Sequence, residues 1–143
     1  MVWYAYIAIA FLSVAIAFFG NYFLQRKLIA TNNKEKGIDF VVDMIKELET
    51  LYIDYWNKET HCSNTSLKIK ITQTRSNEFL NFLHKKYQLE NKGIITLSLV
   101  KLITKATNED FDSSKRTKSN LNKPIEIAKY TNKIILELLK NKI

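Results

Sequence analysis

Only three side chains in this sequence have the soft-ligand chemistry of a metal site. They are the adjacent His61 and Cys62, and the distant His84. Structural metal sites pair such ligands at short, regular spacings, which these three residues do not have. We therefore expect neither a metal nor another cofactor. A single cysteine also excludes an intrachain disulfide, as is usual in a reducing compartment.

Catalytic motifs are equally scarce. The sequence contains no HExxH, no CxxC and no serine with a plausible histidine and acid partner. The three glycines, at positions 20, 37 and 93, do not form a phosphate-binding cluster. Two histidines without a shared motif give no support for general acid–base catalysis. We therefore expect a protein that is not an enzyme.

The strongest candidate for specific binding is the polar run TNEDFDSSKRTKSNLNK, residues 107–123. Loops of this length in compact domains tend to be functional or disordered. Turn-forming residues on both sides of Phe111 would let its ring fold back onto the helices as an anchor. A basic cluster follows, which would bind phosphate groups with an affinity that falls as salt rises. The alternative is a solvated basic loop. The cluster consists of Lys115, Arg116, Lys118 and Lys123.

The N-terminal apolar run is the first segment of the sequence that predicts a helix. Residues 2–24 are 23 uncharged residues. At a rise of about 1.5 Å per residue, this length spans a hydrocarbon core of about 30 Å. A cleaved export signal requires basic residues before its apolar core, and no basic residue precedes this run. The sequence therefore predicts a retained transmembrane helix over residues 2–25.

Small and weakly polar residues recur along one side of this predicted helix. Such a face allows close helix packing in lipid, and a Ser or Asn can donate a hydrogen bond across the interface. The sequence therefore favours self-association through this face, with a monomeric anchor as the alternative. The face consists of Ala10, Ser13, Ala17, Gly20 and Asn21.

Basic residues follow the run but do not precede it. The positive-inside tendency therefore predicts an N-terminus outside the membrane and residues 26–143 in the cytoplasm. We expect Arg26 and Lys27 to contact anionic lipid headgroups. Residues 26–37 are interpreted as a basic juxtamembrane linker, ending in a polar stretch at residues 32–37.

Residues 38–143 are predicted to form an all-α cytoplasmic bundle of about four helices. Apolar residues recur at helical spacing over 38–56, 94–106 and 124–139. Residues 64–90 are interpreted as a further helix, although LKIKIT alternates like a strand. Gly93 is expected to cap the end of that helix. Pro124 is expected to open the last helix, which would bury Ile127, Ile134, Ile135, Leu138 and Leu139 on one side.

Charge is unevenly distributed along the chain. The net charge is +8, which favours anionic partners, although a lysine-rich composition bias is the alternative. Residues 37–63 hold two basic and six acidic residues, whereas residues 64–143 hold sixteen basic and seven acidic. We expect the acidic helix to dock onto a basic surface, within its own chain or on a neighbouring chain.

The order of these segments resembles small membrane proteins of bacterial prophages and defence islands. Those proteins have an N-terminal span, a helical body and an FDS-type turn near the C-terminus. The turn here is Phe111-Asp112-Ser113-Ser114. The resemblance implies a membrane effector, and in Hailong-type antiphage systems a nucleotide-derived oligomer restrains such an effector.

Two classes of function follow from these observations. The first is an effector of antiphage defence or of a mobile element, whose spans form a homo-oligomer and a pore that depolarises the membrane. An oligonucleotide or another anionic regulator would bind its basic part. The second is a non-enzymatic anchor that recruits a co-encoded or other cytosolic protein. Membrane-tethered nucleic-acid binding is a third reading.

Overall fold

The chain is all-helical in the computed structural model, as the sequence predicts. The structure describes residues 2–58, 62–107, 111 and 122–142, with the side chains of residues 2–11 excluded. These residues form four α-helices, a C-terminal 3-10 turn and no strand. The elements are α1 (Val2–Asn57), α2 (Ser63–Tyr87), α3 (Lys92–Thr107), α4 (Lys123–Leu139) and η1 (Lys140–Lys142).

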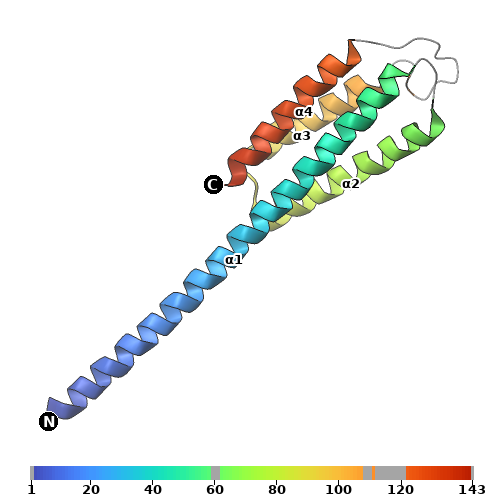
Figure 1. Ribbon diagram of the computed structural model, residues 1–143. Helices are drawn as coiled ribbons and strands as arrows, with labels where there is room; N and C mark the ends of the chain where they lie inside the picture. The colour runs from blue at the N-terminus through green and yellow to red at the C-terminus, as the bar shows by residue number, and fades with distance from the viewer. Residues whose placement is uncertain (1, 59–61, 108–110, 112–121, 143) are drawn as a thin grey trace. The chain divides into compact units, whose positions relative to one another are not determined.

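The molecule divides into two units, Met1–Lys34 and Glu35–Ile143. The first unit is the N-terminal part of α1, and almost all of its described side chains are exposed. The second unit contains the rest of α1 with α2, α3 and α4, which run beside one another as a bundle (Figure 1). We call this second unit the bundle. Among the side chains that are described, no helix has a stretch long and apolar enough to cross a membrane.

The core of the bundle follows a heptad-like spacing. Buried residues recur at alternating steps of three and four, which keeps one stripe of each helix facing the common axis. This confirms the apolar faces expected for residues 38–56 and 94–106. The stripes are Ile38, Val41, Ile45, Leu48, Tyr52 and Tyr55 on α1, Ile95, Leu99, Leu102 and Ala106 on α3, and Ile127, Thr131, Ile134 and Leu138 on α4.

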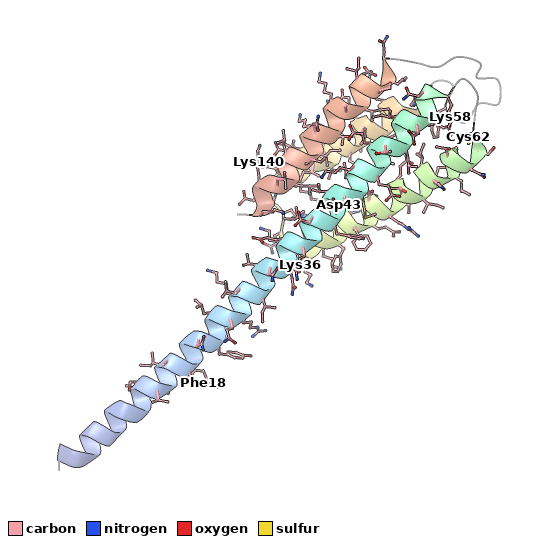
Figure 2. The ribbon with its side chains drawn as sticks, viewed as in Figure 1. Phe18, Lys36, Asp43, Lys58, Cys62 and Lys140 are labelled. Carbon is pink, nitrogen blue, oxygen red and sulfur yellow. The ribbon has the colours of Figure 1, made fainter. Side chains whose placement is uncertain are left out.

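Polar contacts fix the Gly37 end of the bundle. At the Gly37 end, Asp39 of α1 forms an ion pair with Lys142. At the same end, the amide N–H of Glu90 donates to Asn141 Oδ1 at 2.6 Å, which joins the α2–α3 turn to η1. Lys36 and Lys140 mark this end, and Lys58 and Cys62 mark the opposite end (Figure 2). The helices therefore alternate in direction along the chain, as in an up-down-up-down bundle.

Several sequence-based expectations need correction. Residues 32–37, expected to be a linker, continue α1 without a break. Gly93 does not cap α2, because it lies within α3, and left-handed Gln88 caps α2 with its N–H bonded to His84 O at 2.8 Å. Leu139 is exposed, not buried, because it lies off the stripe of α4. Pro124 is the second residue of α4, one later than expected.

Helix α2 contributes an unusually polar stripe to the core. Its buried residues are Ser66, Ile69, Thr72, Ser76, Leu80 and Leu83. Half of these side chains are small and polar, and the Ser76 hydroxyl is satisfied by donating to Thr72 O at 2.8 Å. Gly37 lets α1 come close to the buried Leu83 of α2, because a Cβ added at Gly37 would lie 2.5 Å from Leu83 Cδ2. Four large apolar side chains of α2 are exposed, namely Leu67, Ile71, Phe79 and Phe82, whereas Ile69, Leu80 and Leu83 are buried.

Candidate functional site

The small-residue face of α1 is the first candidate surface. Ser13, Ala17, Gly20 and Asn21 are all exposed, and no atom lies within 4 Å of a Cβ built at Gly20. The side chain of Ala10 lies outside the described part. Among the described residues, no side chain therefore covers Gly20, where a second helix could pack closely. Arg26 and Lys27, one to two turns further along α1, are exposed as well.

A buried polar and aromatic cluster joins three helices at the other end of the bundle. Trp56 Nε1 donates to Ala106 O at 2.8 Å, which ties the end of α1 to the end of α3. Lys123 Nζ lies 5.3 Å from the centre of the Trp56 ring and donates to Lys105 O at 3.0 Å. The ring of Phe111 packs on Tyr55 with centroids 4.7 Å apart. We call these contacts the Trp56 clasp.

The Trp56 clasp changes the interpretation of the predicted basic cluster. The expected docking of Phe111 onto the helices is confirmed, because its ring is half-buried against the core. Lys123 is buried, and its ammonium contacts its own chain instead of facing solvent. Lys123 therefore holds the start of α4 in place and is poorly placed for a soluble anion. Lys115, Arg116 and Lys118 lie outside the described residues.

The outer face of the α2–α3 hairpin is a surface that the sequence analysis did not identify. Residues 63–107 hold eight basic and two acidic residues, a net charge of +6. Seven large apolar side chains are exposed on the same hairpin, more than on the other described residues of the bundle together. They are Leu67, Ile71, Phe79, Phe82, Ile94, Leu97 and Val100. The ring of Phe79 also packs against Phe40 of α1, with centroids 4.8 Å apart. We call this surface the hairpin face.

Shallow hollows cover the hairpin face. One of about 360 Å³ lies around Ile71 and Arg75, and another of about 330 Å³ lies at Phe79 and Phe82. A groove of about 350 Å³ runs between α2 and α3 and includes Val100. Lys86 Nζ lies 5.5 Å from the centre of the Phe82 ring, so the cation covers part of the aromatic surface. The face therefore offers apolar contact area interleaved with positive charge.

Cys62 is the N-cap residue of α2, directly before Ser63. The Thr65 hydroxyl donates to Cys62 Sγ at 3.2 Å, and this hydrogen bond lowers the pKa of the thiol. His84 lies near the opposite end of α2 and lines a small hollow with Leu89 and Ile95. The described residues contain no group of three or more histidine, cysteine or acidic side chains arranged to hold a metal ion.

Comparison with known proteins gives no further guidance. No family model matches the chain, and no curated protein or solved structure matches it. The small-residue face of α1, the Trp56 clasp and the hairpin face are therefore interpreted from their own chemistry.

Proposed function

We propose that the protein is a non-enzymatic membrane effector that self-associates through the small-residue face of α1. The membrane part of the proposal rests on the sequence of residues 2–24, which carry no charge over 23 residues. The four basic residues at 26, 27, 34 and 36 favour a cytoplasmic bundle at the inner membrane of a bacterium.

The observation that carries self-association is the open face around Gly20. Nothing lies within 4 Å of a Cβ there, so a second helix backbone could approach as closely as small residues allow in lipid. Ser13 and Asn21 share this exposed face and offer polar groups that could line a pore or bond across an interface. An assembled pore would depolarise the membrane. The resemblance to small defence proteins extends this proposal to antiphage defence under the control of an anionic regulator.

Expression in a bacterial host tests the effector function. We expect overproduction of the full chain to arrest growth and to collapse the membrane potential, measured with a potential-sensitive dye. Ala17→Ile with Gly20→Ile should relieve both effects at equal protein level, because bulky side chains block close packing. Ala15→Ile is the matched control, because it adds the same side chain on the opposite side of the helix. A normal potential at high expression would contradict the pore.

A second candidate function is a membrane-anchored scaffold, and the groove between α2 and α3 favours it. The groove of about 350 Å³ is open and lined by both helices, as is common where a partner helix docks. Replacing residues 2–24 by an unrelated transmembrane helix separates the two functions. A scaffold keeps its activity after this exchange, whereas an effector that works through Gly20 loses it.

A further inference from the structure

We infer that the hairpin face docks onto a bilayer surface that contains anionic lipid. The inference rests on the proposed membrane location and adds a second contact, made by the bundle itself. It begins from the mixed inner stripe of α2. This helix buries Ser66, Thr72 and Ser76 beside Ile69, Leu80 and Leu83, whereas Leu67 and Phe82 are 59% and 53% exposed. A soluble monomer gains nothing from this arrangement, since exposed apolar patches of this kind mark interaction surfaces.

The basic residues on the hairpin face indicate what kind of surface it contacts. Basic side chains alternate with the apolar ones along the outer side of α2, and the pattern is typical of helices that lie in a membrane interface. They are Lys68, Arg75, Lys85 and Lys86, with Glu78 as the one acidic residue of α2. Lys86 Nζ lies over the Phe82 ring, so positive charge and aromatic surface are adjacent on this side of α2.

Other occupants fit the hairpin face less well. A second copy docked face to face would bring two surfaces of like charge together, since each hairpin has a net charge of +6. The acidic part of α1, residues 35–57, has a net charge of −4 but exposes a single large apolar side chain, Phe40. Nucleic acid would use the lysines and the exposed Phe82 ring, but not the aliphatic Leu67, Ile71 and Val100. A bilayer with anionic headgroups uses both kinds of side chain.

Docking places a requirement on the chain. Residues 2–24 are proposed to cross the same bilayer on which the hairpin face lies. Both contacts must therefore form on one bilayer. Residues 25–34 are exposed throughout except for the half-buried Lys34, so they contribute little side-chain packing that would oppose this.

Site-directed spin labelling of the full chain in nanodiscs tests the inference. In a Cys62→Ser background, one label replaces Ile71 on the hairpin face and a control label replaces Ile125 on α4, whose side chains are 44% and 71% exposed. In discs of phosphatidylcholine with phosphatidylglycerol, the label at 71 should lose about threefold in accessibility to a water-soluble nickel reagent. The label at 125 should stay accessible, and discs of phosphatidylcholine alone should protect neither label.

Charge-reversed variants separate lipid docking from other causes of protection. Lys68→Glu with Arg75→Glu should abolish the protection at 71, whereas Lys129→Glu with Lys133→Glu on α4 should leave it unchanged. Equal accessibility at 71 and 125 in the acidic discs would overturn the inference, as would equal protection in both lipids. Extraction of the chain from the discs by alkaline carbonate would contradict the proposed membrane span of residues 2–24. Failure of the span is therefore distinguishable from failure of docking by the hairpin face.

Discussion

The bundle portion of α1 and the neighbouring α2 use the same periodicity in opposite ways. From Glu35 onward, α1 places most of its large apolar and aromatic side chains inward, with Phe40 as the exposed exception, and Leu48 and Tyr52 are fully buried. In α2, three of the six buried side chains are hydroxyls, and four large apolar side chains are exposed on its outer side. The contrast indicates that α1 is built to hold the core, whereas α2 is built to present a surface.

The largest expected change in stability comes from a matched pair of leucines, one in α1 and one in α2. Leu48→Ala empties a fully buried position of α1 and should lower the free energy of unfolding by about 2–5 kcal/mol. Leu67→Ala removes the same atoms from an exposed position of α2 and should change it by less than about 0.5 kcal/mol. Denaturant unfolding followed by circular dichroism measures both values. Similar losses at the two positions would break the comparison.

A matched pair of glycines tests the close approach of α1 to α2. Gly37→Ala places a methyl group 2.5 Å from Leu83 Cδ2 in the core, whereas Gly93→Ala in α3 meets no atom within 4 Å. Gly93→Ala should stabilise the protein by roughly 0.5–1 kcal/mol through helix propensity. Gly37→Ala should be less stable than Gly93→Ala by about 1–3 kcal/mol, because overpacking offsets that gain. Thermal unfolding of both variants gives the difference, and equal stabilities would exclude tight packing at Gly37.

The smallest effect concerns the polar contact between these helices. The Tyr52 hydroxyl accepts a hydrogen bond from the side-chain amide of Gln73, and burial raises the pKa of this tyrosine well above its ordinary value of 10.0. The folded state therefore keeps the phenol protonated, and its stability should fall as the pH rises above about 10, where the unfolded chain ionises. Tyr52→Phe should flatten this part of the pH profile of unfolding. A profile unchanged by the substitution would contradict the assignment to Tyr52.

Much of the fold follows from local patterns in the sequence. The helices over 38–56 and 94–106 and the docking of Phe111 were predictable, because spacing and turn residues are local signals. The inward face of α2 was not, since its stripe is as polar as its surroundings and LKIKIT offers apolar residues on more than one side. The Trp56 clasp was also hidden, because Lys123 lies 67 residues beyond Trp56 and basic residues are usually exposed.

The oligomeric mass of the full chain in detergent tests the central proposal most directly. We predict an oligomer for the wild-type chain, a monomer for Ala17→Ile with Gly20→Ile, and an unchanged oligomer for Ala15→Ile. Light scattering coupled to size-exclusion chromatography gives these masses. A monomeric wild-type chain, or an oligomer that survives the changes at Ala17 and Gly20, would contradict self-association through this face of α1.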